Sequence, residues 1–191
     1  MIGQTDETEQ KATVEATEMR GTQGPHHPAE VWVIYGRDGV VKNQVFDLLR
    51  KVHLRPIEFS RAVRRSGSGS PFVLDVVLNE IRRAPAIVAL LSADELVELK
   101  PELQDDAQVE DLRREAGYQP RPNVLLETGM ALALMRNRTI VMTAGALRPI
   151  TDMQGLHELR WDNSTKKRFD LVSRLEKLGL PVDKDGDDWL D

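Results

Sequence analysis

The fold is decided by VWVIY, residues 31–35, which is followed by Gly36, Arg37 and Asp38. β-Branched and aromatic residues fill this run, as in a strand that is buried on both faces of a parallel sheet. AIVALLS, residues 86–92, is the most hydrophobic strand candidate of the chain. These two runs predict neighbouring strands in the middle of one sheet.

Segments with a helical pattern alternate with the remaining strand candidates. Apolar residues recur at helical spacing from Val45 to Val52, and PIEF (56–59) is predicted to be the second strand. TIVMTAG (139–145) is the fourth strand, and HELRW (157–161) is a short edge strand before a last amphipathic helix. The alternation predicts an α/β fold in three layers, with a central, mostly parallel five-stranded sheet and helices on both faces.

The two ends of the chain and one insertion differ in composition from this core. Residues 1–30 contain almost no large apolar side chain, so we expect a disordered tail before a single domain at 31–180. An acidic, helix-prone insertion occupies 94–118. Residues 181–191 are expected to be a solvated acidic tail, because DKDGDD (183–188) lacks the glutamate that completes a calcium loop.

The composition excludes several classes of function. The 191 residues carry a net charge of −5, with 26 basic side chains scattered among 31 acidic ones, so direct nucleic-acid binding is not expected. The absence of cysteine rules out thiol catalysis and fits a cytoplasmic protein. No stretch is apolar enough to cross a membrane, and the four histidines show no ligand spacing, so no metal is assigned.

Ligands of parallel sheets bind beyond the carboxyl ends of the strands, which here means the loops that start at Gly36, Ser60, Ser92 and Gly145. In the loop at 60–71, the segment RRSGSGSP precedes a helix that we expect at 71–83, with Ser70 as its N-cap and Val73, Val77 and Ile81 facing inward. Two arginines before a helix N-terminus favour an anion, although a mobile connector explains the glycines and serines equally well.

Two charged residues are candidates for chemistry at this edge. Arg37 could bind a pyrophosphate, or it could be a solvated loop residue. Glu127 is the one charged residue within 124–134, on a helix that we expect Asn123 to cap. Gly129 suggests that something approaches this helix closely. A buried carboxylate needs a partner or a use, and hydrogen bonds to its own backbone are the alternative to catalysis.

Four of these segments together resemble a known family. VWVIYGRD, AIVALLSADEL, RPNVLLETGMALAL and RPITDMQG resemble the bacterial TIR-like predicted nucleotide-binding domains, over residues 31–180. These are relatives of the TIR effectors of cyclic-nucleotide antiphage signalling. The resemblance implies a flavodoxin-like TIR fold in which Glu127 cleaves NAD+, a substrate and not a cofactor, at the nicotinamide glycosidic bond. It implies substrate-binding roles for Tyr35, Gly36, Arg37, Arg64, Arg65, Gly67, Ser68, Gly69, Ser70, Ser92 and Asn123.

The resemblance also implies activation by self-assembly through TIR domains. Two alternatives remain open, namely a module that binds a nucleotide or cyclic nucleotide without cleaving it, and an assembly adaptor. A response regulator is disfavoured, because the first strand ends without an acidic pair and AIVALLS has no acceptor aspartate at its end.

Overall fold

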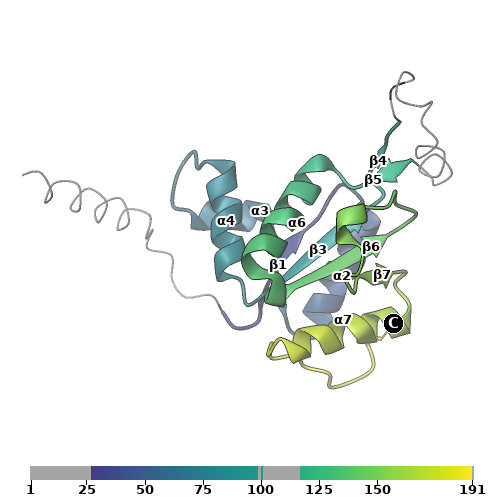
Figure 1. Ribbon diagram of the computed structural model, residues 1–191. Helices are drawn as coiled ribbons and strands as arrows, with labels where there is room; N and C mark the ends of the chain where they lie inside the picture. Colours follow the sequence, from purple (N-terminus) through teal and green to yellow (C-terminus); the bar gives the residue numbers. More distant parts are fainter. Residues whose placement is uncertain (1–26, 99, 101–116, 191) are drawn as a thin grey trace, which may run out of the picture.

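The computed structural model describes residues 27–98, 100 and 117–190 (Figure 1). Its central sheet contains five strands in the order β2-β1-β3-β6-β7, and every neighbouring pair is parallel. The strands are β1 (Glu30–Ile34), β2 (Arg55–Ile57), β3 (Ala86–Ser92), β6 (Thr139–Ala144) and β7 (Leu159–Trp161). The predicted α/β fold is confirmed, and its sheet is wholly rather than mostly parallel.

Helices cover both faces of this sheet. On one face lie α2 (Gly39–Lys51) and α7 (Thr165–Lys177), and on the other lie α3 (Phe59–Arg65), α4 (Val73–Arg83) and α6 (Pro122–Met135). Two hydrophobic cores lie on the two faces of the sheet, the first under α2 and α7 and the second under α3, α4 and α6. Side chains of β1 point to these faces alternately: Val31 and Val33 lie in the first core, and Trp32 and Ile34 lie in the second. All five residues of β1 are buried, as the apolar run VWVIY predicts.

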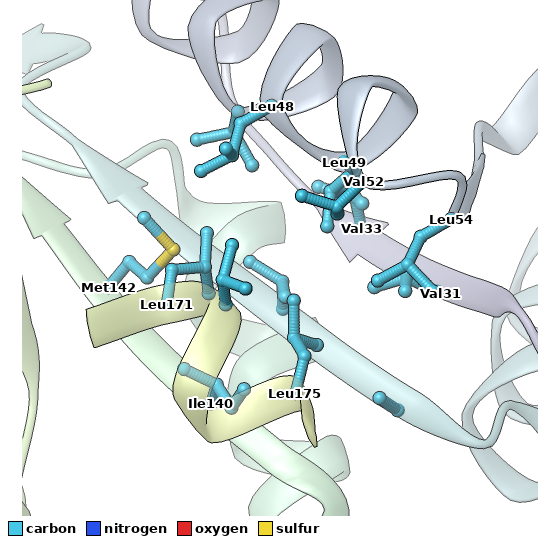
Figure 2. Close-up of a cluster of buried hydrophobic side chains, with 14 of the residues drawn as sticks. Val31, Val33, Leu48, Leu49, Val52, Leu54, Ile140, Met142, Leu171 and Leu175 are labelled. Carbon is cyan, nitrogen blue, oxygen red and sulfur yellow. The ribbon is translucent and has the colours of Figure 1, made fainter. Parts of the chain in front are cut away.

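Figure 2 shows the first core, where side chains of two helices meet those of the sheet. Leu48 and Leu49 of α2 and Leu171 and Leu175 of α7 pack over Val33 and Met142. The helix α2 begins where it does because the Asp38 carboxylate accepts hydrogen bonds from the backbone N–H groups of Val40 and Val41. The same residue therefore ends the loop after β1 and starts the helix that covers it.

Smaller elements follow the β3 strand and the β6 strand. β4 (Glu95–Leu96) and β5 (Tyr118–Gln119) form an antiparallel pair at the two ends of the acidic insertion. Most of that insertion, residues 99 and 101–116, lies outside the described residues. The short 3₁₀ helices are η2 (Arg136–Arg138) and η3 (Thr151–Met153).

The segment at 59–72 differs from the sequence prediction. Residues 59–65 are helical rather than part of a loop, because Ala62 of α3 is buried against the second core. The next helix starts at Val73 with Phe72 at its N-cap position, so Ser70 does not cap it. Val77 and Ile81 face inward as predicted, but Val73 is 58 % exposed and Val76 takes its place in the core.

The domain extends beyond both predicted boundaries. At the N-terminal end, Ala29 and Glu30 are already buried, and residues 1–26 lie outside the described part of the chain. At the other end, Val182, Trp189 and Leu190 pack on the first core, whereas residues 184–188 are exposed. Trp189 is only 4 % exposed, and its carbonyl accepts a hydrogen bond from the buried Arg168 guanidinium.

Among the helices of the described residues, none combines the length and the apolar character that a membrane span requires.

The packing of Trp189 predicts that the C-terminal segment contributes to stability. We expect Trp189→Ala to lower the free energy of unfolding by about 3–5 kcal/mol, since it removes a buried indole and leaves a cavity. Val40→Ala is a matched control at a side chain that is 69 % exposed, and it should change this free energy by less than about 0.5 kcal/mol. Urea denaturation measures both, and equal effects of the two variants would show that the segment is not part of the cooperative unit.

Candidate active site

The candidate site lies at the carboxyl edge of the sheet. The helices α4 and α6 each lead directly into the amino end of the following parallel strand, β3 and β6, so both helices begin at the opposite, carboxyl edge. The loop after β1 and the end of β3 lie at this edge as well. Four segments far apart in the sequence therefore meet there, as the sheet topology requires.

Asp94, two residues after the end of β3, joins these segments. Its Oδ1 atom accepts hydrogen bonds from the backbone N–H groups of Arg37, at 3.1 Å, and Asp38, at 3.2 Å. The same oxygen accepts from the Ser92 hydroxyl at 2.9 Å. Its Oδ2 atom accepts from the backbone N–H of Arg121 at 3.3 Å, at the start of α6. One carboxylate thus fixes the β1 loop relative to the helix that carries Glu127.

Gly36 is required by this arrangement. A Cβ atom at Gly36 would overlap the carboxylate of Asp94, so no other residue fits without moving Asp94. Ser92 is only 1 % exposed, and its hydroxyl is occupied by Asp94. Gly36 and Ser92 therefore contribute to the site through their contacts with Asp94.

Glu127 lies in the second turn of α6. The helix begins at Pro122, so Glu127 is its sixth residue rather than the fourth, and Asn123 is an exposed second residue rather than the N-cap. Val124, Thr128 and Ala131 form the buried stripe of α6. Glu127 is three residues after Val124 and four before Ala131, so it lies at the flank of that stripe and is half-buried.

The carboxylate of Glu127 has no bonded partner within the part of the chain that the structure describes. Among the described residues, none forms a hydrogen bond or an ion pair with it. Burial raises the pKa of Glu127 above its ordinary value of 4.5, and the nearby positive charge of Arg121 opposes this rise only in part. Glu127 therefore does not hydrogen-bond to the backbone of α6, which was the alternative to a role in catalysis.

The outer side of α6 is open. A Cβ atom at Gly129 would meet no other atom of the described chain within 4 Å, so the close approach that Gly129 suggested does not occur within this molecule. Leu126 is 61 % exposed. On the inner side, the hydroxyl of Thr128 is buried without a hydrogen-bond partner among the described residues.

The other residues predicted at the β1 loop differ in their surroundings. Arg37 is exposed, and its side chain forms no hydrogen bond or ion pair with a described residue, so its guanidinium remains available. Tyr35 instead packs edge-on against Phe46, with ring centroids 5.6 Å apart, and Lys42 places its ammonium 4.6 Å from the Tyr35 ring centroid. Tyr35 therefore belongs partly to the α2 side of the sheet.

Arg65, which the resemblance assigns to the substrate, is bonded to another residue of the fold. Its guanidinium forms a bidentate ion pair with Glu30, and this pair raises the pKa of Arg65. Glu30 is the first residue of β1, at the amino end of that strand and away from the candidate site. Arg64 is exposed. Together with Arg55 and Arg61 it lines a cavity of about 500 Å³ near the edge strand β2.

The loop after α3 is shaped by its own serines. The Ser66 hydroxyl donates to the Val63 carbonyl at 2.7 Å and accepts from the Ser68 N–H, and the Ser68 hydroxyl accepts from the Ser70 N–H. Residues 67–70, including Gly67 and Gly69, are exposed, and they lead into the N-terminus of α4 at the carboxyl edge. This loop therefore presents backbone groups to solvent just before the N-terminus of α4.

Sequence reasoning missed Asp94, the residue that organises the site. The available signal was an aspartate two residues beyond the third strand, combined with a glycine directly after Tyr35 at the same edge of the sheet. The acidic composition of 94–118 concealed it, because Asp94 looked like the first residue of a solvated insertion.

The family model described as CAP12/Pycsar effector protein, TIR domain, matches residues 30–163. The chain belongs to this family. The resemblance seen in the sequence is thereby confirmed, and the domain is a TIR-like fold of an antiphage effector family. A search of the curated proteins finds no match to the chain. Within the ranges that the structure describes, this TIR domain contains no group of three potential metal ligands.

The contacts of Asp94 predict that its loss destabilises the domain. Asp94→Ala removes the acceptor of three backbone N–H groups, so we expect the free energy of unfolding to fall by about 2–3 kcal/mol. Asp152→Ala, at an exposed position of η3, is the control. Chemical denaturation compares the two, and an Asp94→Ala protein as stable as the control would contradict the role assigned to Asp94.

The raised pKa of Glu127 predicts a pH-dependent difference in stability. The folded state holds the Glu127 proton more tightly than the unfolded state, so stability is lost as the pH rises from the ordinary value of 4.5 through the raised one. Glu127→Gln should therefore melt at a higher temperature than the native protein at about pH 8, and the difference should disappear towards about pH 4. Glu98→Gln, at an exposed glutamate, is the control, and a difference independent of pH would refute the explanation.

Proposed function

We propose that this TIR domain binds NAD+ and cleaves it at the nicotinamide glycosidic bond. The observation that carries the proposal is Glu127, a half-buried carboxylate without a bonded partner in the described chain, held at the ligand-binding edge of the sheet. Leaving a carboxylate unpaired in partly apolar surroundings is unfavourable for folding, so a use at a site of reaction explains it.

The chemistry of this bond needs one carboxylate. Nicotinamide is bonded to the ribose as a cationic pyridinium, so the bond breaks with its electron pair leaving on nicotinamide, which departs as a neutral molecule. No acid has to protonate the leaving group, unlike in the usual hydrolysis of glycosides. Positive charge grows on the anomeric carbon, and ionised Glu127 stabilises it until water adds and releases a proton.

The surrounding residues supply roles for the rest of the substrate. Arg37 has a free guanidinium at the same edge and is suited to the pyrophosphate, which it can bind in a bidentate manner. The exposed serine and glycine backbone of 67–70 can donate hydrogen bonds to the nucleotide. Asp94 and Gly36 keep the β1 loop in place without contacting the substrate.

Exposed apolar side chains support activation by self-assembly. Phe72 and Val73, at the start of α4, are 68 % and 58 % exposed, and Leu126 and Leu134 on α6 are 61 % and 42 % exposed. Leu126 directly precedes Glu127, and Phe72 and Val73 begin a helix at the same edge of the sheet, whereas Leu134 lies near the opposite end of α6. Exposed large apolar side chains are typical of surfaces that are covered by another protein. A second copy of the domain would cover them and exclude water from Glu127.

The alternative is a module that binds a nucleotide without cleaving it. One observation favours it, because Glu127 does not line the cavity of about 720 Å³ at this edge. Saturable nucleotide binding without release of nicotinamide under assembling conditions would identify this function.

The decisive experiment follows free nicotinamide and any cyclised product when concentrated protein is incubated with NAD+. We expect the rate per molecule to rise with protein concentration, and Glu127→Gln to reduce it by at least about 100-fold, because it removes the charge that stabilises the transition state. Glu98→Gln should retain the native rate. A Glu127→Gln protein that releases nicotinamide as fast as the native domain would exclude the mechanism.

A further inference from the structure

A second site is suggested by the cavity of about 720 Å³ at the β6–β7 side of the sheet. Its floor is a row of side chains on three neighbouring strands, since Leu91 is the register partner of Thr143 and Thr143 is the partner of Arg160. Leu159 and Trp161, on either side of Arg160, enter the core on the opposite face. The floor therefore lies on the face that α6 covers.

The segment 145–158 forms the wall of this cavity. It leaves β6 at Gly145, which has a φ of +81°, a conformation that glycine adopts without strain. Leu147, Ile150, Met153 and Leu156 pack against the second core, and the backbone N–H of Arg148 donates to the Tyr118 carbonyl at 2.8 Å. The wall thus carries polar as well as apolar groups, and it is fixed both to the core and to β5.

The charges in the cavity do not balance. Arg160 forms an ion pair with Glu158 at 3.1 Å, and both side chains line the cavity. Arg148 also lines it and is half-buried, but no carboxylate of the described chain pairs with its guanidinium. A partly buried guanidinium without a counter-ion favours the entry of an anion, and it can bind a phosphate through two parallel hydrogen bonds.

This cavity is distinct from the candidate active site. Neither Glu127 nor Gly36 nor Arg37 contributes to its lining, although all of them lie at the carboxyl edge of the same sheet. Its volume is within the range of about 300–1,000 Å³ that small-molecule sites usually have. Its lining combines apolar side chains with the charged groups of Arg148, Glu158 and Arg160, which suits a ligand that has both a charged and an apolar part.

We propose that the cavity binds a small organic phosphate that carries an apolar ring, such as a nucleoside monophosphate. The phosphate would pair with Arg148, and the ring would lie between the row formed by Leu91 and Thr143 and the side chains of Leu147 and Met153. This second site does not depend on the proposed cleavage of NAD+, because none of its residues takes part in that reaction.

The test is calorimetric titration of the full chain with AMP, with adenosine and with inorganic phosphate. We expect saturable binding of AMP, and weaker binding of adenosine or phosphate alone, because each offers only one of the two kinds of contact. Arg148→Gln should weaken AMP binding by at least about tenfold, since it removes the charge-assisted pair. Arg136→Gln, at an exposed arginine of η2 outside the cavity, is the matched control.

Two further variants separate the possible outcomes. Ala146→Phe fills the cavity from an exposed position and leaves Arg148 in place, so it should also abolish AMP binding while the melting temperature stays unchanged. Glu127→Gln should leave AMP binding intact. Absence of AMP binding, unchanged affinity in Arg148→Gln or Ala146→Phe, or a loss of binding in Glu127→Gln would each overturn the proposal.

Discussion

The site depends on the carboxylate of Asp94, which accepts hydrogen bonds from the β1 loop, from the end of β3 and from the start of α6. Arg37 lies 57 positions before Asp94 and Arg121 lies 27 positions after it, so one side chain joins a loop and a helix that are distant in the sequence. A negative charge at the beginning of α6 is also favourable for the helix itself, because the free N–H groups there carry partial positive charge. The position of Glu127 relative to the β1 loop is therefore set by electrostatics at a single residue.

Glu127, at the same edge of the sheet, differs from Asp94 in that it accepts no hydrogen bond from a described residue. Asp94 accepts several hydrogen bonds and has a structural role, whereas Glu127 is influenced only by the charge of Arg121 and lies in surroundings that disfavour its ionised form. Two carboxylates in neighbouring positions thus have different environments, and the difference separates a residue that holds the site from one that remains available to a ligand. This contrast, more than the family pattern around Glu127, gives the proposed role of Glu127 its physical basis.

The two proposed ligand sites share part of their support. The wall of the 720 Å³ cavity is bonded to Tyr118 of β5, and the carbonyl of Gln119, next in β5, accepts a hydrogen bond from the backbone N–H of Asp94. The β4–β5 pair therefore lies between the cavity wall and the residue that positions α6. The insertion at 94–118 is therefore attached to the domain between the two proposed sites.

The sequence by itself determined the parallel sheet and the helices on both faces, because apolar runs and helical periodicity record burial directly. It also singled out Glu127, since a charge within an apolar helix stands out. The tertiary structure alone decided the partners: Asp94 as the organising acceptor, Arg65 as the partner of Glu30, Trp189 as a core residue, and the cavity beside Arg148. Each of these depends on contacts between segments distant in the chain, and the spacing of residues along a sequence carries no information about which polar groups meet once it folds.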